Sequence, residues 1–437
     1  MRDTLVMLLA GGMGSRLNVL AQKRAKPAVP FAGSNRIIDF TLANASRSGL
    51  WRVGVLTQYR PFSLTSHLGN GMAWDLWGKE RALRILPPFK GQKDHDWYRG
   101  TSDAVYQNLQ FIRKYDPRRV LILSGDHVYR MDYGKMIRFH CDRGAELTIA
   151  TMSVPWDEAC RYGLLEVDAE HRVIDFQEKP AVPRSNLASM GIYIFESDVL
   201  ERALEDCCEA GEFDFGQAVI PHVHRGRHKP ATGADEGGRV FAYPFNGYWR
   251  DVGTIHSYWE ANMDALDPES GLDLQSWGIR TNTEVDGLDE LPPLRIGHAA
   301  GVRRALLGRG GVIEGTVEHS VLSPGVEVAR GAVVRDSIVM HGTTIAEGAV
   351  VDHAIIDKGA RIGAGARVGV GAEGARPNHD FPTHLDSGLS LVGKGATVPD
   401  GAEIGRNCLV FPGVEARQWA SLRLAAGATL WGEEGGP

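Results

Sequence analysis

Residues 5–17 read LVMLLAGGMGSRL, an apolar run that leads into a glycine-rich turn followed by an arginine. The run predicts a buried strand that ends at the turn. Gly11, Gly12 and Gly14 have no Cβ, so backbone N–H groups there can approach phosphate oxygens, and Arg16 can bind a phosphate through two hydrogen bonds. The spacing fits neither the dinucleotide fingerprint nor the Gly-Lys-Ser/Thr phosphate loop. The segment therefore indicates either a phosphate-binding loop or a tight turn between a strand and a helix.

The first 266 residues alternate between short apolar runs and amphipathic stretches. Strands are predicted at residues 53–57, 120–124 and 147–151, and helices at 102–115 and 133–143. Near-continuous apolar strands separated by helices are typical of a mostly parallel sheet covered on both faces, so we predict an α/β fold with a Rossmann-like domain. Ligands of such folds bind beyond the carboxyl ends of the strands, which places residues 11–16 and 125–127 on one rim.

A six-residue repeat begins after a proline- and acid-rich connection. It places in register Val326, Ala332, Ile338, Thr344, Val350, Ile356, Ile362 and Val368, and then Val392, Val398, Ile404 and Val410. Such a short period predicts a parallel β-helix, which we expect to be left-handed, with these side chains stacked inside. The break at 369–391 predicts an inserted loop. We therefore expect a first domain at 1–266, a linker at 267–294 and a β-helix domain at 295–437.

Many β-helices of hexapeptide repeats are acyltransferases, in which a histidine acts as a base. In this half His319, His341, His353 and His379 could be proposed as such bases. None of them accompanies an identifiable acyl-carrier site, so we predict exposed turn residues and a structural and regulatory role for this half.

The composition is that of a globular protein of two or three domains, with 437 residues, 43% hydrophobic and 23% charged. A net charge of −6 argues against general binding to nucleic acid or membrane surfaces. Five cysteines without CxxC or Cys/His metal spacing indicate reduced thiols. No apolar stretch approaches the roughly 20 residues that span a bilayer. The first strand is predicted near residue 4, which leaves no room for a signal peptide, so we expect a cytoplasmic protein.

Two aspartates stand where a metal ion can bind. Asp126 directly follows a predicted strand, and Asp251 precedes a predicted helix. Carboxylates from distant chain positions can converge on Mg²⁺, a hard ion that prefers oxygen ligands. Simpler interpretations stay open: Asp251 could cap the following helix or pair with Arg250, and Asp126 could cap the helix near Tyr133.

Two further segments can recognise a nucleotide or a sugar. Residues 97–101, WYRGT, precede a predicted helix, which Thr101 or Ser102 could cap, or the segment could hold a base and a sugar. Glu178 and Lys179 stand at the exit of a predicted hairpin. Their carboxylate can bind sugar hydroxyls and their ammonium a phosphate, although an isolated pair of this kind is usually a surface ion pair.

Nine stretches match one enzyme family: GGMGSRL at 11–17, KRAKPAV at 23–29, RIIDF at 36–40, TQY at 57–59, WYRGT at 97–101, GDHVY at 125–129, EKP at 178–180, ASMGIY at 188–193 and YWRDVGT at 248–254. Together they resemble the bacterial ADP-glucose pyrophosphorylases, the glucose-1-phosphate adenylyltransferases of glycogen synthesis. The glycine turn is shared by all sugar-nucleotide pyrophosphorylases. KRAKPA, WYRGT and YWRDVGT are specific to the ADP-glucose branch.

The resemblance implies a nucleotidyltransferase domain that makes ADP-glucose and pyrophosphate from ATP and glucose 1-phosphate, with Mg²⁺ as cofactor. It assigns the ATP site to Gly11, Gly12, Gly14, Arg16, Lys26, Gln58 and Tyr98. It assigns the glucose 1-phosphate site to Tyr98, Gly163, Glu178, Lys179 and Ser189. Asp126 and Asp251 would hold the metal, and Arg16, Lys26 and Asp126 would carry the catalysis.

Regulation and assembly are also implied by the resemblance. Members of the family are homotetramers and bind glycolytic metabolites in a basic cleft between the domains, to which Lys23, Arg24 and Arg36 would contribute. These three could instead be solvated basic residues. Two rival functions stay open: a catalytically silent regulatory subunit, and a uridylyl-, thymidylyl- or guanylyltransferase on the same scaffold.

Overall fold

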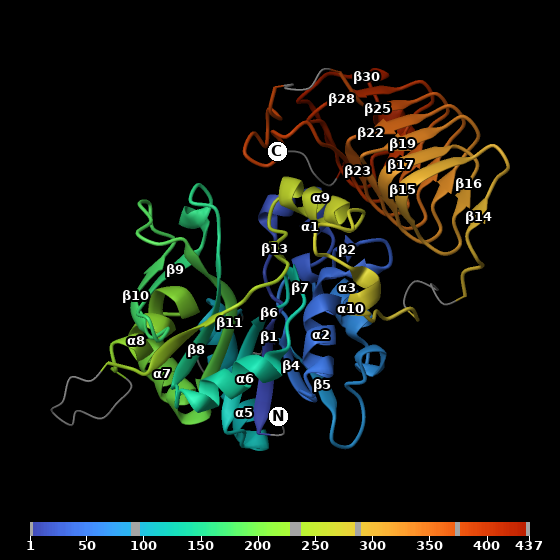
Figure 1. The fold of residues 1–437 in the computed structure, drawn as a ribbon. Coiled ribbons are helices and arrows are strands. Elements are labelled where there is room, and N and C mark those ends of the chain that lie inside the picture. The colour runs from blue at the N-terminus through green and yellow to red at the C-terminus, as the bar shows by residue number, and fades with distance from the viewer. Residues whose placement is uncertain (1–2, 89–96, 228–236, 285–289, 372–375, 434–437) are drawn as a thin grey trace.

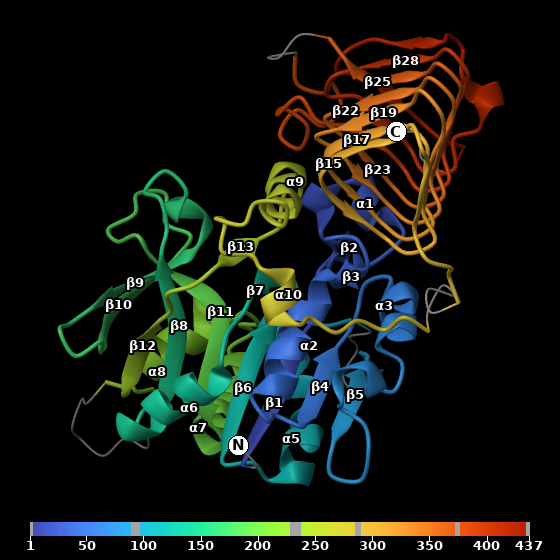
Figure 2. The same cartoon turned by 45° about the vertical axis from the view of Figure 1, so that its right-hand side comes forward.

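The computed structural model describes residues 3–88, 97–227, 237–284, 290–371 and 376–433. It contains an N-terminal α/β domain and a C-terminal β-helix, which Figures 1 and 2 show from two directions. Residues 285–289 of the expected linker and 372–375 of the expected loop lie outside the described residues. None of the described helices is long and apolar enough to cross a membrane.

The α/β domain is built on a nine-stranded sheet. Its strands are β1 (Thr4–Leu9), β4 (Arg52–Leu56), β5 (Ala82–Leu86), β6 (Arg119–Ser124), β8 (Leu147–Ser153), β9 (Gly163–Val167), β10 (Val173–Glu178), β11 (Leu187–Glu196) and β12 (Val240–Pro244). The centre is parallel, since β1 pairs in parallel with β4 and β6, and β4 with β5. Strand β11 runs antiparallel to β6 and β8, and β10 antiparallel to β9. The prediction of a mostly parallel α/β domain is confirmed.

Helices cover both faces of this sheet. The two sheet cores contain side chains of α2 (Ile37–Arg47), α3 (Pro61–Leu68) and α6 (Tyr133–Asp142) on one face, and of α4 (Thr101–Gln107), α5 (Leu109–Tyr115), α7 (Ser197–Glu209) and α8 (Ile220–His224) on the other. The helices α1 (Val19–Gln22), α9 (Ile255–Asp264) and α10 (Leu274–Trp277) pack instead in the core shared with the β-helix. Alternate residues of β1 face two cores: Leu5 and Met7 belong to the core with α4, α5 and α7, and Val6 and Leu8 to the core with α2, α3 and α6. This double burial explains the uninterrupted apolar run in the sequence.

The helix expected at 102–115 is in fact two helices, α4 and α5, with a break at Asn108. The side chain of Asn108 donates from Nδ2 to the hydroxyl of Tyr98, at 3.0 Å, and to the backbone oxygen of Ala104, at 2.9 Å. An asparagine that bonds to the backbone of its own turn competes with the helix, and this accounts for the break.

The second domain is a parallel β-helix of short strands, as predicted. Its strands are β14 (Arg295–Ile296), β15 (Gly301–Leu307), β16 (Val312–Ile313), β17 (Thr316–Leu322), β18 (Glu327–Val328), β19 (Val333–Arg335), β20 (Ile338–Val339), β21 (Thr344–Ile345), β22 (Val350–Asp352), β23 (Ala354–Ile356), β24 (Arg361–Ile362), β25 (Arg367–Val370), β26 (Ser390–Val392), β27 (Thr397–Val398), β28 (Glu403–Gly405), β29 (Leu409–Val410), β30 (Arg423–Leu424) and β31 (Thr429–Leu430). Strands of successive coils pair in parallel in two sheets, one of six strands and one of twelve. Between β25 and β26 the chain makes the excursion expected at 369–391.

The predicted register of the β-helix is wrong at two positions. Val317, Val334 and Val351 are paired in successive coils, so a coil spans 17 residues, and three steps of six overshoot it by one. Thr344 and Val350 are consequently half-buried, whereas their neighbours Ile345 and Val351 are fully buried inside the coil.

The β-helix histidines also differ from the prediction. His379 is exposed, but the other three are half-buried. His319 Nδ1 lies 2.7 Å from Asp336 Oδ1, and the ring of His353 packs edge-on against Trp259 of α9 with 4.7 Å between centroids. His341 lines a cavity between the domains. These rings are half-buried because the α/β domain and neighbouring coils pack against the turns that carry them.

The corrected register predicts a difference between neighbouring residues. Ile345→Ala removes a fully buried side chain, so we expect the free energy of unfolding to fall by about 2–5 kcal/mol. Thr344→Ala alters a half-buried position and is expected to cost less than about 1 kcal/mol. Denaturant-induced unfolding of the two variants measures the difference. Equal losses would contradict the 17-residue coil.

Candidate active site

The glycine turn after β1 is shaped by close contacts at two of its glycines. Gly14 has φ of 64°, in the left-handed region, and a Cβ there would lie 2.8 Å from Cβ of Lys26. A Cβ on Gly11 would lie 3.1 Å from Cβ of Gln58. Gly14 therefore requires glycine, whereas a larger residue at position 11 would crowd the side chain of Gln58.

A cavity of roughly 300 Å³ opens beside this turn. Among its lining residues are Leu9, Gly11, Gly12, Lys26, Leu56, Gln58, Tyr98, Thr101, Ala104, Ser124 and Asp126. It brings together six of the residues expected to bind ATP or metal, which come from five separate stretches of chain. Backbone N–H groups and an ammonium on one wall and aliphatic side chains on another suit a ligand with a phosphate chain and a flat apolar ring.

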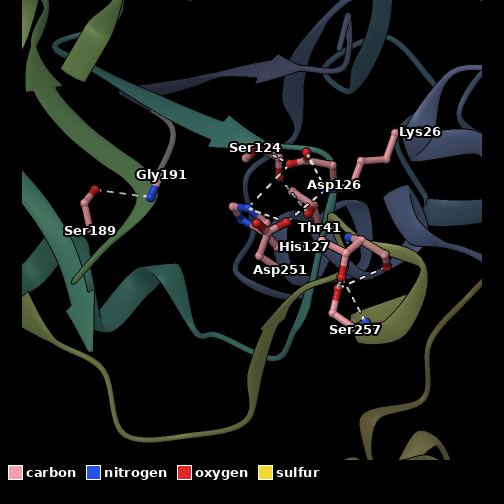
Figure 3. A network of polar contacts seen from close by, with 10 residues as sticks. Lys26, Thr41, Ser124, Asp126, His127, Ser189, Gly191, Asp251 and Ser257 are labelled. Carbon is pink, nitrogen blue, oxygen red and sulfur yellow. Dashed lines mark hydrogen bonds and ion pairs between the residues drawn. The ribbon is translucent and has the colours of Figure 1, made fainter. Parts of the chain in front are cut away.

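Asp126 and Asp251 converge because two short strands pair. Strand β7 (His127–Tyr129) is antiparallel to β13 (Trp249–Asp251), and this pairing sets Asp251 opposite His127. The ammonium of Lys26 lies between the two carboxylates, 2.9 Å from Oδ2 of Asp126 and 2.9 Å from Oδ1 of Asp251. Figure 3 shows Asp126, His127 and Asp251 gathered beside Ser124.

The ammonium of Lys26 and the carboxylate of Asp126 stabilise each other's charged forms. Burial alone would lower the pKa of Lys26, but the attraction of Asp126 and Asp251 outweighs burial and raises it. Burial would likewise raise the pKa of Asp126, yet the charges of Lys26 and His127 and a hydrogen bond from Ser124 keep it well below its usual range. Asp126 is therefore a carboxylate at neutral pH, as a metal ligand must be.

The simpler interpretations of the two aspartates are wrong. The residue that caps α6 is Asp132, which accepts a hydrogen bond from the backbone nitrogen of Gly134 at 2.8 Å. Helix α9 is capped by Thr254. Arg250 pairs with Asp264 at 3.3 Å. Neither Asp126 nor Asp251 is thus explained by a helix cap, and the ammonium of Lys26 is the cation beside both.

Arg16 lies outside the cavity lining but reaches the same group of side chains. A Cβ built on Gly253 would be 3.1 Å from Nη2 of Arg16 and 3.0 Å from Oδ1 of Asp251. The guanidinium is therefore close to Asp251, on the side where the glycine turn ends. A ligand phosphate between them would meet a cation from Arg16 and another from Lys26.

Glu178, Lys179 and Gly163 come together at the end of the β9–β10 hairpin, where Gly163 pairs with Glu178. A Cβ on Gly163 would lie 2.7 Å from Oε2 of Glu178, so glycine leaves room for the carboxylate. Burial raises the pKa of Glu178, opposed by the nearby ammonium of Lys179, whose Nζ is 3.3 Å from Oε1. Lys179 has φ of 46° directly before Pro180, a strained backbone conformation of the kind found at ligand-binding sites.

Ser189 and Tyr98 lie on different sides of the site. Ser189, on β11, accepts a hydrogen bond from the backbone nitrogen of Gly191 at 3.3 Å. The hydroxyl of Tyr98 donates to the backbone oxygen of Leu86 at 3.1 Å, and burial raises the pKa of Tyr98 to about 12. The hydrogen bonds of the described residues thus join Tyr98 to the ATP-side residues rather than to Ser189 or Glu178.

A second, basic cavity of roughly 610 Å³ lies between the domains. It contains the three residues expected to bind an effector, Lys23, Arg24 and Arg36. The β-helix contributes the side chains of His341, Lys358 and Lys394. Arg24 is buried and binds both oxygens of Asp357, at 2.8 and 2.6 Å, so it also joins the two domains. Arg36 donates to the backbone oxygen and to the hydroxyl of Ser63, both at 2.9 Å.

Comparisons with known proteins match both halves of the chain. A nucleotidyl transferase family model matches residues 5–268, and a GlmU-like, C-terminal hexapeptide model matches residues 295–391. The glucose-1-phosphate adenylyltransferase of Thermotoga neapolitana is 46% identical over 431 residues, 98% of each chain. That of Acetivibrio thermocellus is 42% identical over 433 residues, again 98% of each. The chain belongs to the glucose-1-phosphate adenylyltransferase family.

Two residues of the family motifs acquire a role that the sequence did not suggest. His127 is the third member of a group whose ligand atoms, with those of Asp126 and Asp251, lie within 4.8 Å of one another. Gly191 packs beside it, since a Cβ there would lie 3.5 Å from Cε1 of His127. His127 belongs to the family motif GDHVY and Gly191 to ASMGIY. The sequence did not show that they are neighbours, because the pairing of β7 with β13 and the irregular register of β11 bring them together.

The position of Lys26 predicts how metal binding and stability are coupled. Lys26→Met leaves two carboxylates facing each other without a cation, so we expect a loss of about 1–3 kcal/mol of stability in the absence of divalent ions. Mg²⁺ should then raise the melting temperature of the variant more than that of the parent. Thermal unfolding with and without Mg²⁺ measures both effects. The same rise for both proteins would show that the ion does not neutralise this pair.

Proposed function

We propose that this chain transfers the adenylyl group of ATP to glucose 1-phosphate, forming ADP-glucose and pyrophosphate for glycogen synthesis. The observation that carries the proposal is the meeting of Lys26, Asp126 and Asp251 at the wall of a cavity that also contains the glycine turn. Phosphate-binding groups, a divalent-ion site and an apolar wall then lie together, as adenylyl transfer requires.

The reaction is a displacement at phosphorus. An oxygen of the sugar phosphate attacks the α-phosphorus of ATP, a new P–O bond forms, and the bond to the leaving pyrophosphate breaks. No side-chain nucleophile is needed, because both reacting groups are already phosphates. The work of the protein is to hold two anions in line and to balance the charge that develops on pyrophosphate.

Each side chain has a role that follows from its position. N–H groups of the turn at Gly11, Gly12 and Gly14 hold phosphate oxygens, and Arg16 and Lys26 balance the charge of the leaving pyrophosphate. Asp126 and Asp251 would hold Mg²⁺, since carboxylate oxygens are the donors that this ion prefers. When bound, Mg²⁺ neutralises and aligns the phosphates.

The other substrate is assigned to the hairpin side. Glu178 accepts hydrogen bonds from sugar hydroxyls, and Lys179 pairs with the phosphate of glucose 1-phosphate. Gly163 and Ser189 complete this side: the first leaves room for the Glu178 carboxylate, and the second presents a hydroxyl from β11. Tyr98 contributes through its backbone at the nucleotide side, because its hydroxyl is already bonded to Leu86 and Asn108.

The function is tested by pyrophosphate release from glucose 1-phosphate with ATP, UTP, dTTP or GTP. We expect turnover with ATP, and a fall in kcat of about 10³-fold or more in Asp126→Asn with the fold retained. Lys179→Ala should raise KM for glucose 1-phosphate and leave KM for ATP unchanged, with the exposed Lys135→Ala on α6 as a matched control.

Each of the other possible results of these assays would contradict part of the proposed function. Turnover with UTP, dTTP or GTP but not with ATP would identify another sugar-phosphate nucleotidyltransferase. No turnover with any nucleotide would favour a regulatory subunit without catalysis. A variant Asp126→Asn that works at the parental rate would remove Asp126 from the mechanism.

We also propose that the cavity between the domains binds a phosphorylated glycolytic metabolite that controls the rate. Six cationic or imidazole side chains converge there, including Lys23, Arg24 and Arg36. Since Arg24 stands two residues before Lys26 and is bound to Asp357, an anion that attracts Arg24 can move the segment that carries Lys26. This gives a physical path from the effector to the site of chemistry.

The regulatory proposal predicts an effect of an exposed lysine on the far wall of this cavity. Lys394→Ala removes one cation, and we expect the half-effective concentration of an activating sugar phosphate to rise about 5- to 10-fold. Rates titrated with a panel of phosphorylated glycolytic intermediates measure it, with Lys135→Ala as control. Titration curves that coincide for parent and Lys394→Ala would rule out this cavity.

For the assembly and its location, we propose a cytoplasmic homotetramer. The first coil of the β-helix has an open side: among the described strands, β14 pairs with β16 alone and β15 with β17 alone, and Ile296 and Val302 are exposed there. A second copy of the chain can cover such an edge. The free cysteines fit a reducing compartment. Sedimentation equilibrium should give four times 47.7 kDa, and a monomer mass would refute the assembly.

A further inference from the structure

The wall of the nucleotide cavity offers few polar side-chain atoms to a base. Leu9, Leu56 and Ala104 are apolar. The hydroxyl of Thr101 is engaged, since it donates to Oδ2 of Asp214 at 3.1 Å and accepts from the backbone nitrogen of Phe215 at 3.1 Å. The hydroxyl of Tyr98 is bonded outside the cavity. The amide of Gln58 is therefore the side-chain group on this wall best able to distinguish one base from another.

Two contacts fix the orientation of that amide. Its Nε2 donates to the backbone oxygen of Tyr98 at 3.3 Å. Its stem rests on the backbone of Gly11, where a Cβ would lie 3.1 Å from Cβ of Gln58. Turning the amide over would bring two acceptor oxygens together, so Nε2 stays on the side of Tyr98. Among the described residues no hydrogen bond ends on Oε1 of Gln58, which leaves this oxygen as an acceptor.

The carbonyl of Tyr98 is itself held in place. Its phenol donates to the backbone oxygen of Leu86 at 3.1 Å and accepts from Nδ2 of Asn108 at 3.0 Å. Asn108 is anchored in turn on the backbone oxygen of Ala104 at 2.9 Å. The break between α4 and α5 thus serves to position Tyr98, and through Tyr98 the amide of Gln58.

We propose that Gln58 selects the base of the nucleotide substrate, because its fixed Oε1 accepts a hydrogen bond from the exocyclic amine of adenine. An acceptor at this position suits the 6-amino group of adenine and opposes the 6-keto oxygen of guanine and the 4-keto oxygen of uracil and thymine. Unpaired polar atoms in a desolvated pocket are costly, so a single oriented acceptor can give substantial discrimination. This proposal rests on the proposed adenylyl transfer and specifies how its nucleotide is recognised.

The test deletes each partner of the hydrogen bond, separately and together. ATP is compared with purine riboside 5′-triphosphate, which lacks the amine, in the parent and in Gln58→Leu, and kcat/KM is measured by pyrophosphate release at saturating glucose 1-phosphate. In the parent, loss of the amine should lower kcat/KM about 10- to 100-fold. In Gln58→Leu the same loss should change it less than about 3-fold, because the acceptor has gone.

A control variant separates the acceptor from general damage. The exposed Gln110→Leu on α5 removes a glutamine amide away from the cavity and should keep the parental penalty for the missing amine. A penalty of parental size in Gln58→Leu would overturn the proposal, since another group would then read the amine. If the parent turned over no nucleotide at all, the proposed function itself would fail.

Discussion

The ammonium of Lys26 between the carboxylates of Asp126 and Asp251 is the interaction on which the rest of the site depends. It joins the segment of Lys26 to two others, which are 100 and 225 residues away in sequence, through bonds of 2.9 Å each. Two carboxylates so close together would repel each other and draw protons if no cation lay beside them. Because Lys26 supplies that cation, the two acidic side chains can lie close together beside the cavity, as the proposed divalent-ion site requires.

The same segments are attached to the β-helix. Arg24, two residues before Lys26, is bound to Asp357 in a buried ion pair, and Trp259, eight residues after Asp251, donates from its indole nitrogen to the backbone oxygen of Asp336 at 2.8 Å. The β-helix thus supports the chain on both sides of the site of chemistry. This arrangement connects the second domain to the site, since a shift of either contact would reach Lys26 or Asp251.

The sequence predicted the features that depend on local pattern. Apolar runs marked the strands, and a carboxylate directly after one of them, Asp126, was expected at the ligand-binding rim. The partnership of His127 with Asp251 could not be predicted, because it depends on antiparallel pairing between strands more than 120 residues apart. The register of the β-helix was missed for a different reason. Val350 and Val351 are neighbouring aliphatic residues, and from the sequence either one could face the inside of the coil. A six-residue period places Val350 inside and does not reveal that the coil has 17 residues.

The most direct test of the divalent-ion site is diffraction from crystals of the full chain grown with Mn²⁺ and a non-hydrolysable ATP analogue. Mn²⁺ is detected by its anomalous signal and takes the oxygen ligands that Mg²⁺ takes. An anomalous peak about 2.2 Å from a carboxylate oxygen of Asp126 and of Asp251, beside the phosphates, is the expected result. Mn²⁺ held by phosphates alone, with both aspartates still bound to Lys26, would contradict the account.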